Sequence, residues 1–468
     1  MNSTRNTFDY DVAVVGGGSA GYAAARTAAD AGLRTVVIEG AKEVGGLCIL
    51  RGCMPTKALL YAADVLHQTR QASRWGLRVA GVGYDFSQVM ARKNALIHEF
   101  AVYRQEQLTN AKFKFIQATA QFADKSTLTL SSGETLTARS FIIATGSTVA
   151  PPTLPRLKDL GYLTSDGGVI MNKLPHSLII LGGGAVAVEA AQFFVRFDVK
   201  VTLIQRSEHI LKDFDADAAV ELEKVLRREG VTLFTNTKLT EAWQEGGLKG
   251  VSFQHGGQTV RVAAEEIMFA QGRVSNTAGL GLDTAGVFTE HGRIPTNTEM
   301  QTTAPHIYAA GDCTGPHEIV HLAIVQGEIA AHNISHPSKK RSMDYRLFTR
   351  VIFTNPEVAA VGLGEREAKA RNLSYQAASY PFNDHGKSLI MEARDGFVKL
   401  LANPTTGEIL GGSVIGPMGG ELIHEIIAAM HKHMTVHELA AMPHYHPTLA
   451  EIWTYPAAEL AAKILVKH

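Results

Sequence analysis

The sequence has 468 residues, 45% of them hydrophobic, so the chain is long enough for about three domains of ordinary size. Its 45 lysines and arginines balance its 45 aspartates and glutamates, and the absence of like-charge blocks argues against a nucleic acid or an anionic membrane as partner. Three cysteines, a polar start and no membrane-spanning apolar run argue against a disulfide-stapled secreted protein and predict a cytoplasmic one.

The first predicted elements form a βαβ unit with a glycine-rich turn. The first strand spans Asp11–Val15, the alanine-rich helix Ala20–Ala31 and the second strand Thr35–Ile38. The turn has the spacing G-x-G-x-x-G, with its glycines at Gly16, Gly18 and Gly21. Such a turn lets bare backbone approach a pyrophosphate at the N-terminus of the helix.

Glu39 ends the second strand, twenty-three residues after Gly16. A carboxylate at this distance can accept hydrogen bonds from the ribose hydroxyls of a dinucleotide. A tight turn with a purely structural role is the alternative interpretation of the glycines. The complete βαβ context and the acid favour a dinucleotide site.

The next segment carries two cysteines, Cys48 and Cys53, ahead of an apolar helix. Five residues of ideal helix rise about 7.5 Å, beyond the Cα separation of roughly 7 Å that a disulfide spans. A disulfide therefore requires an irregular first turn, which Gly52 permits and Pro55 favours because it lacks an N–H. The helix N-terminus favours the thiolate form. Lys57 shares the helical face of Cys53 and adds a cation.

This cysteine pair has three possible interpretations: a redox centre, a metal site or two inert buried thiols. A metal site needs further cysteine or histidine ligands close by, and none is evident, so we predict no metal. Because the pair directly follows the dinucleotide turn, the sequence favours a redox function. Cys313 has no cysteine neighbour and is expected to be a small core residue.

Between the first unit and its later repeat lie a helical stretch and a strand-rich piece, at about Lys112–Leu136. They are followed by the segment SFIIATGS at Ser140–Ser147. A linker is then marked by the prolines Pro151, Pro152 and Pro155.

A second βαβ unit repeats the order of the first. Its strands are predicted at Ser177–Leu181 and Lys200–Ile204, with a helix through Phe197 between them. The glycine-turn positions are occupied by Gly182, Gly184 and Ala187. Two copies of one unit imply two nucleotide sites.

The acid of the first unit has no counterpart in the second. Twenty-three residues after Gly182 stands Gln205, followed by Arg206. A carboxylate would repel a 2′-phosphate, whereas an amide and an arginine accept one, so the second site favours NADPH over NADH. The alternative is that Arg206 is only a solvated loop cation.

The remaining chain completes the predicted architecture. It passes through Gly272 and Arg273 to a strand and turn over His306–Asp312, and then to a helix. From about Arg346 strands alternate with long helices, as in an α+β domain. We predict a first nucleotide-binding domain in two parts, 1–150 and 276–345, a second one at 151–275 and a C-terminal domain at 346–468.

Together these motifs resemble the pyridine nucleotide-disulfide oxidoreductases, which include dihydrolipoamide dehydrogenase, glutathione reductase and mercuric reductase. The resemblance covers essentially the whole chain. Its most specific part is the stretch G-G-x-C-x-x-x-x-G-C-x-P-x-K, which runs from Gly45 to Lys57. Here Leu47 replaces the family's threonine, and Ile49, Leu50 and Arg51 are unusual. The fold implied is α/β, with two Rossmann-like domains for FAD and NAD(P) and a C-terminal α+β dimerisation domain.

The resemblance also implies the cofactor-binding residues. The first unit is implied to bind FAD, with Asp312 on the flavin's ribityl chain. Further residues implied at the FAD site are Gly46, Lys57, Ala144, Thr145, Gly146, Gly272, Arg273 and Gly311. The stretch Ala270–Asn276 departs from the family's G-R-x-P-N at Ser275. The second turn with Gln205 and Arg206 is implied to bind NAD(P), and Glu189 to pair with the flavin-side Lys57.

Near the C-terminus, His446 and Glu451 match the family's H-P-T-x-x-E. The resemblance implies a homodimer in which this histidine serves the active site of the partner subunit. Thiol-disulfide exchange needs a proton donor and acceptor near neutrality, and a carboxylate can orient such an imidazole. The neighbouring His444 is expected to be an ordinary residue.

The implied catalytic residues are Cys48, Cys53, Lys57, Glu189, His446 and Glu451. They predict an enzyme that passes electrons between a nicotinamide, FAD, the cysteine pair and a small disulfide or dithiol, with Cys48 as the thiolate that attacks the substrate. Lipoamide is the favoured substrate, and Arg51 is expected to approach it.

Three alternatives to a lipoamide enzyme remain. One is an NADPH-dependent reductase of glutathione-type or other disulfides, or of metal ions. Mercuric reductase is disfavoured because the sequence ends at His468 without a C-terminal cysteine pair and keeps a histidine where those enzymes have none. A third is a flavin electron-transfer subunit that turns over no disulfide, which the combination of cysteines, lysine, histidine and glutamate argues against.

Overall fold

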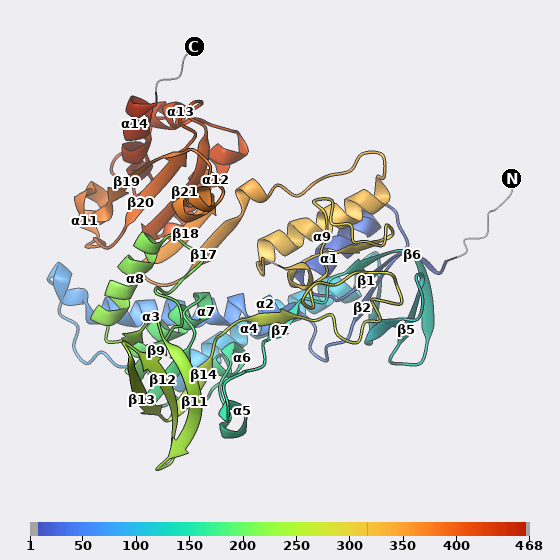
Figure 1. The fold of residues 1–468 in the computed structure, drawn as a ribbon, viewed down its shortest axis with the longest axis horizontal. Coiled ribbons are helices and arrows are strands. Elements are labelled where there is room, and N and C mark those ends of the chain that lie inside the picture. The colour runs from blue at the N-terminus through green and yellow to red at the C-terminus, as the bar shows by residue number, and fades with distance from the viewer. Residues whose placement is uncertain (1–7, 316, 465–468) are drawn as a thin grey trace. The chain divides into compact units, whose positions relative to one another are not determined.

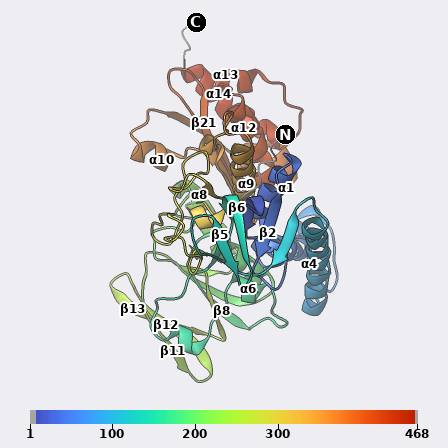
Figure 2. The ribbon, with the colours of Figure 1, turned by 90° about the vertical axis from the view of Figure 1, so that its right-hand side faces the viewer.

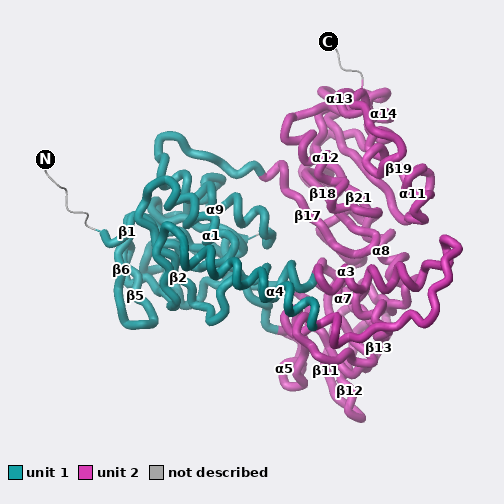
Figure 3. The backbone as a smooth tube through the Cα atoms, turned by 180° about the vertical axis from the view of Figure 1, so that it is seen from behind, with its two compact units in different colours: residues 1–56, 91–151, 272–344 teal, residues 57–90, 152–271, 345–468 magenta. Residues whose placement is uncertain are grey.

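The computed structural model describes residues 8–315 and 317–464. The chain forms two compact units, each assembled from separate stretches (Figure 3). Unit 1 consists of residues up to 56, 91–151 and 272–344, and unit 2 of residues 57–90, 152–271 and 345 onward. No helix among the described residues combines the length and apolar character needed to cross a bilayer.

Unit 1 is built on a seven-stranded sheet in the order β3-β2-β1-β6-β5-β4, with β16 also paired to β6. Its strands are β1 (Tyr10–Val15), β2 (Thr35–Glu39), β3 (Lys114–Gln117), β4 (Ala120–Phe122), β5 (Thr127–Leu130), β6 (Thr135–Ile143) and β16 (Ile307–Ala309). The strands β1, β2, β3, β6 and β16 pair in parallel, and β4 and β5 are antiparallel additions at one edge. Figure 2 shows β2, β6 and β5 within this sheet. Strands β1 and β2 and the second half of β6 are nearly continuous, buried apolar runs, as is usual for central strands of a parallel sheet that is covered on both faces.

Two helices pack side by side in unit 1, α1 (Ser19–Asp30) and α9 (Val320–Ser335) (Figure 1). Small residues bring their backbones together, since a Cβ on Gly327 would lie 2.3 Å from the carbonyl oxygen of Ala20. Other elements with residues in unit 1 are α2 (Gly46–Leu50), the start of α3 (Cys53–Arg70), most of α4 (Phe86–Thr109), and the paired short strands β7 (Ser147–Val149) and β15 (Arg273–Ser275).

The first part of unit 2 contains the second βαβ unit. A parallel sheet in the order β10-β9-β8-β14 comprises β8 (Ser177–Leu181), β9 (Lys200–Ile204), β10 (Thr232–Phe234) and β14 (Glu266–Phe269). Its helices are α5 (Leu157–Leu160), α6 (Ser165–Gly168), α7 (Ala185–Arg196) and α8 (Ala216–Arg228). An antiparallel ribbon adds β11 (Lys238–Glu245), β12 (Leu248–His255) and β13 (Gln258–Ala264).

The C-terminal part of unit 2 is a five-stranded antiparallel sheet in the order β17-β18-β21-β20-β19. The strands are β17 (Thr349–Ile352), β18 (Glu357–Gly362), β19 (Gln376–Pro381), β20 (Phe397–Ala402) and β21 (Ile409–Gly416). The helices are α10 (Glu365–Ala370), α11 (Gly386–Ile390), α12 (Gly419–His431), α13 (Val436–Ala441) and α14 (Thr454–Lys463). Helices α12 and α14 pack on this sheet around a core that includes Phe382 and Trp453.

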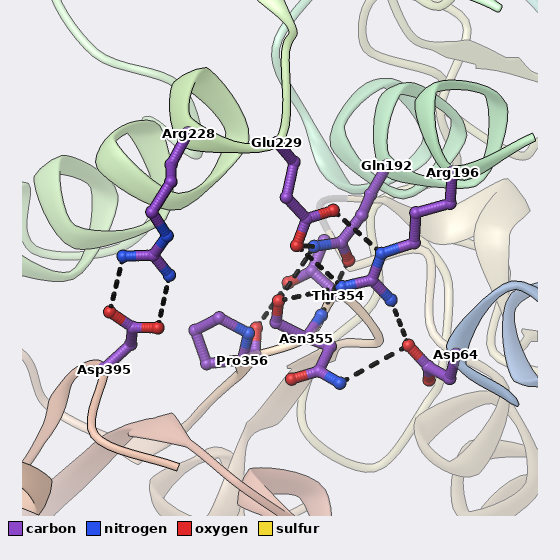
Figure 4. A network of polar contacts seen from close by, with 9 residues as sticks. All are labelled: Asp64, Gln192, Arg196, Arg228, Glu229, Thr354, Asn355, Pro356 and Asp395. Atoms are coloured by element: carbon purple, nitrogen blue, oxygen red, sulfur yellow. Dashed lines mark hydrogen bonds and ion pairs between the residues drawn. The ribbon is translucent and has the colours of Figure 1, made fainter. Parts of the chain in front are cut away.

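A buried polar network inside unit 2 ties three of its elements together (Figure 4). Arg196 of α7 pairs with Asp64 of α3 and, at 2.7 Å, with Glu229 at the end of α8. Gln192, one turn earlier on α7, donates to the carbonyl oxygen of Asn355 at 2.8 Å and accepts from its N–H at 2.7 Å. Burial raises the pKa of Asp64 although Arg196 opposes it. The network therefore holds the loop before β18 against α3 and α7.

The predicted elements of both βαβ units are confirmed, with small differences at their ends. The helix expected over Ala20–Ala31 spans Ser19–Asp30, and the strands Ser177–Leu181 and Lys200–Ile204 form as predicted. Helix ends shift readily by one or two residues because the terminal hydrogen bonds are the weakest. The four-part division at 150, 275 and 345 stays a prediction.

Candidate functional site

The first glycine turn leaves an open cradle at the start of α1. Gly16 has a φ of +107°, and a Cβ there would lie 2.3 Å from the carbonyl oxygen of Ala144. A Cβ on Gly21 would lie 1.8 Å from the carbonyl oxygen of Gly16, whereas Gly18 has nothing within 4 Å of that position. Gly46 packs against one side of this turn, since a Cβ on Gly46 would lie 2.9 Å from the Cα of Gly18. The open backbone at a helix N-terminus fits the pyrophosphate of FAD.

Glu39 lies beside this turn and is already partly engaged. Its Oε2 accepts the N–H of Gly17 at 2.7 Å, and its Oε1 accepts the N–H of Ala41 at 2.8 Å. Each carboxylate oxygen has a second acceptor site, so the carboxylate retains capacity for ribose hydroxyls.

The other residues predicted to bind FAD belong to unit 1, except for Lys57, which belongs to unit 2. Arg273 donates from Nε to Ser147 Oγ at 2.8 Å, and Ser147 Oγ donates to Asp312 Oδ2 at 2.6 Å. Ser275, which stands where the family's proline is usual, donates from Oγ to the carbonyl oxygen of Asp312 at 3.0 Å. The pairing of β7 with β15 thus brings the segment of Ala144, Thr145 and Gly146 to that of Gly272 and Arg273.

Two further residues of this region were missed by the sequence analysis. Ser147 lay in the quoted SFIIATGS segment but was given no role, and it links Arg273 to Asp312. Glu318 is an exposed residue whose pKa is raised by partial desolvation of its carboxyl group first and by Asp312 second. It lies six positions after Asp312, but no sequence motif marked it.

The helix is interrupted between the two cysteines. Helix α2 ends at Leu50 and α3 begins at Cys53. A Cβ on Gly52 would lie 3.0 Å from the carbonyl oxygen of Leu47 and 3.2 Å from the Cα of Cys48, so the close approach of the backbone favours glycine here. The expected irregular turn is confirmed. Cys48 and Cys53, both half-buried, lie in two separate helices instead of one turn and a half apart along a single helix.

Arg51, at the interruption, forms an ion pair with Glu43 at 2.6 Å. Both side chains are at least half exposed. Its approach to a substrate stays a prediction, and Glu43 partly neutralises its charge.

Within unit 2, Lys57 and Glu189 meet as the family resemblance implies. Lys57 Nζ lies 2.8 Å from Oε2 and 3.1 Å from Oε1 of Glu189, whose side chain is only 3% exposed. The N–H of Phe353 donates to the same carboxylate at 2.9 Å, and Lys57 Nζ lies 4.5 Å from the centre of the Phe353 ring. Phe353, which the sequence analysis missed, thus holds the pair from both its backbone and its ring.

The second glycine turn repeats the geometry of the first. Gly182 has a φ of +123°, a Cβ there would lie 2.3 Å from the carbonyl oxygen of Ala270, and Gly184 is open. Ala187 is fully buried behind the turn. This cradle fits a second dinucleotide.

Gln205 and Arg206 differ in their surroundings. Gln205 is buried against the turn, and its Nε2 donates to the carbonyl oxygen of His209 at 3.4 Å. Arg206 is exposed and forms no ion pair with any described residue. Its guanidinium is therefore available to a ligand at the end of β9.

His446 and Glu451 form the expected pair. His446 Nδ1 lies 2.9 Å from Oε2 and 3.2 Å from Oε1 of Glu451. The imidazole is 77% exposed, whereas the carboxylate is 10% exposed. A neutral imidazole that donates from Nδ1 to this carboxylate presents Nε2 to solvent as a proton acceptor.

A second histidine, His385, lies on the buried side of Glu451 and was not anticipated. Its Nε2 is 3.4 Å from Glu451 Oε1, and its Nδ1 is 2.8 Å from Ser388 Oγ. Burial lowers the pKa of His385, opposed by Glu451. His444, by contrast, is held by Glu425 at 2.7 Å, as suits a structural residue.

Cys313 is expected to resist alkylation in the native protein. It is completely buried, its Sγ lies 3.4 Å from the carbonyl oxygens of Ile143 and Ala310, and burial raises its pKa to about 11. At pH 8 only about one thousandth of this thiol is ionised. Mass spectrometry after iodoacetamide treatment of the reduced protein should find Cys48 and Cys53 modified and Cys313 modified only after denaturation. Equal labelling of all three would contradict a buried Cys313.

Comparison with known proteins gives consistent matches along the chain. Residues 10–327 match the pyridine nucleotide-disulphide oxidoreductase family, and residues 348–457 match the dimerisation domain of that family. A dihydrolipoyl dehydrogenase of Bacillus subtilis is 36% identical, over 89% of this chain and 90% of the relative. A mercuric reductase of Staphylococcus aureus is 31% identical, over 91% of this chain and 78% of the relative. The structure of the HOCl-induced flavoprotein disulfide reductase RclA from Escherichia coli is 26% identical, with a TM-score of 0.85 over 96% of this chain and 99% of RclA.

Proposed function

Because the chain belongs to the pyridine nucleotide-disulphide oxidoreductases, we propose that it exchanges electrons between NADPH and a small disulfide through Cys48 and Cys53. The fold is α/β, with FAD- and NAD(P)-binding parts and a C-terminal dimerisation domain, and the enzyme is FAD-dependent. Lipoamide, or its dithiol in the reverse direction, is the first substrate proposed, since the relatives named dihydrolipoyl dehydrogenase are similar over nearly the whole chain. The exposed Arg206 favours the second candidate, an NADPH-dependent reductase of another disulfide.

The chemistry assigned to the chain's own residues is thiol-disulfide exchange. The reduced Cys48 thiolate attacks one substrate sulfur, the substrate's S–S bond breaks, and the first product thiol takes a proton from His446. Cys53 then attacks Cys48, which releases the second thiol and forms the Cys48–Cys53 disulfide. Overall one dithiol and one disulfide become one disulfide and two thiols. FAD, when bound, supplies the two-electron link between the cysteine pair and the nicotinamide.

The observation that carries this proposal is the interrupted helix at Gly52, which sets two half-buried cysteines in separate helices. An electron-transfer subunit without disulfide turnover has no use for that interruption, nor for an exposed imidazole held by a buried carboxylate. Lys57, paired with Glu189, adds a cation about one helical turn into α3.

Anaerobic titration of the FAD-loaded protein tests the proposal. Two-electron uptake from NADPH with long-wavelength thiolate-to-flavin absorption is expected. Bleaching of the flavin alone would instead support an electron carrier. Steady-state assays with lipoamide, glutathione disulfide and metal ions as acceptors then identify the substrate class.

Replacing Arg206 with alanine is expected to lower kcat/KM for NADPH about tenfold and to leave NADH unchanged, because a 2′-phosphate loses its cation. Lys200→Ala is the matched control, since Lys200 is an exposed cation at the other end of β9. Equal loss with both nucleotides, or the same effect from the control, would contradict a 2′-phosphate site at Arg206.

The dimerisation domain indicates a homodimer. Within it, we propose that His446 serves the active site of the partner subunit, in keeping with its exposed ring. A cytoplasmic location stays a prediction.

A further inference from the structure

Arg104 is a half-buried arginine of unit 1 that the reaction described above does not use. It lies on α4, and its guanidinium carbon is 4.3 Å from the centre of the Tyr22 ring on α1. Tyr22 is itself held by an edge contact with Phe113, with ring centres 6.5 Å apart. The ring holds the guanidinium by a cation–π contact, which does not use its N–H groups as hydrogen-bond donors.

The charge of Arg104 is not matched by any carboxylate among the described residues. Its Nε is buried without a hydrogen-bond partner. Two other arginines of unit 1 differ in this respect, because Arg26 pairs with Glu328 at 2.7 Å and Arg51 pairs with Glu43 at 2.6 Å. A half-buried guanidinium without an acceptor is costly to maintain.

Cys48 lies within electrostatic range of this cation. Burial lowers the pKa of Arg104, and Tyr22 and then Cys48 oppose that shift. A Cβ on Gly46, two residues before Cys48, would lie 2.9 Å from the Cα of Gly18, and the N–H of Tyr22 donates to the carbonyl oxygen of Gly18 at 2.9 Å. The contact of Arg104 with Tyr22 therefore lies close to α2, the helix that carries Cys48.

We propose that Arg104 binds a carboxylate of the disulfide substrate while a sulfur of that substrate reacts with Cys48. The substrate class is then small disulfides that carry a carboxylate, which favours the second candidate substrate over the neutral lipoamide, and Arg104 determines specificity. This inference rests on the proposed function for the identity of the substrate. The planar guanidinium can donate two parallel hydrogen bonds to a carboxylate. A neutral amide or hydroxyl ligand accepts hydrogen bonds from it less strongly.

Alkylation of Cys48 tests the anion site without turnover. Iodoacetate carries a carboxylate where iodoacetamide carries a neutral amide, and the two reagents are otherwise alike. The protein is reduced with dithiothreitol and treated with each reagent, and mass spectrometry follows alkylation of the Cys48 peptide. In Arg104→Met the iodoacetate rate should fall about tenfold relative to the iodoacetamide rate, and Arg104→Lys should keep part of the preference. The control is Arg92→Met, an exposed arginine on α4 about 18 Å ahead of Arg104, which should leave the ratio unchanged.

Two results would overturn the inference. If both alkylation rates in Arg104→Met equal those of wild type, no anion is attracted to Cys48. If both rates fall by the same factor, Arg104 acts only on the thiolate or on the fold.

Turnover with matched disulfides separates this inference from the proposed function. Lipoate against lipoamide, and dithiodiglycolate against hydroxyethyl disulfide, give two pairs that differ in carboxylate charge. Wild type should prefer the anionic member, and Arg104→Met should lose about tenfold in kcat/KM with that member alone. If wild type reduces none of the four, the proposed function fails, while the alkylation ratio still decides whether Arg104 forms an anion site.

Discussion

Replacing Cys48 with serine is expected to lower kcat for every disulfide substrate by at least about 10³-fold, since a hydroxyl at neutral pH cannot replace the attacking thiolate. Flavin reduction by NADPH should persist, because it does not require Cys48. Cys53→Ser should cause an equal loss of turnover by blocking resolution of the mixed disulfide. Steady-state NADPH oxidation and stopped-flow flavin absorbance measure the two effects separately.

Cys313→Ala provides the matched control for these variants. It removes a thiol that is fully buried and surrounded by core side chains, so activity at 25 °C should stay within about twofold of wild type. Wild-type turnover by Cys48→Ser would show that electrons leave the protein by another route and would favour the electron-carrier alternative.

His446→Gln is expected to lower kcat by about 10²- to 10⁴-fold, the usual contribution of a positioned acid-base group. The glutamine amide cannot transfer a proton near neutrality. It can still donate a hydrogen bond to the Glu451 carboxylate. His433→Gln is the control, because His433 is also an exposed histidine paired with a glutamate, Glu408, at 2.7 Å. It should leave turnover unchanged.

Mixed dimers test whether His446 acts on the partner subunit. When inactive Cys48→Ser and inactive His446→Gln chains are mixed and allowed to exchange, each hybrid dimer contains one active site with both native residues. About a quarter of wild-type activity should then return, since half of the dimers are hybrids with one working site each. No recovery, with exchange verified by differently tagged chains, would mean that the histidine serves its own chain.

The parts of the structure that the sequence revealed are those encoded locally. The glycine turn at Gly16 and its repeat at Gly182 stand between apolar strands and alanine-rich helices, so spacing alone predicts both βαβ units. The interruption between the cysteines also followed from local chemistry, because Gly52 and Pro55 disfavour a continuous helix. The Lys57 contact with Glu189 came from family resemblance and not from any local signal.

The features that were missed join residues far apart in the chain. Ser147 and Asp312 are 165 positions apart, and the Phe353 N–H lies 164 positions from its acceptor, Glu189. His385 reaches Glu451 from a separate strand-and-turn segment with no motif of its own. Their contacts depend on tertiary packing, which neither periodicity nor spacing records.

Unit 1 is assembled from three separate stretches of the chain, which affects the order in which the two units can fold during synthesis. Strand β16 and helix α9, which complete its sheet and cover α1, come from residues 307–309 and 320–335, whereas β8, β9, β10 and β14 all lie between 177 and 269. A ribosome therefore delivers the whole β10-β9-β8-β14 sheet before the seven-stranded sheet of unit 1 can close. Nascent chains halted near residue 300 should protect the second βαβ unit from protease and retain no flavin, so flavin capture is a late event in biogenesis.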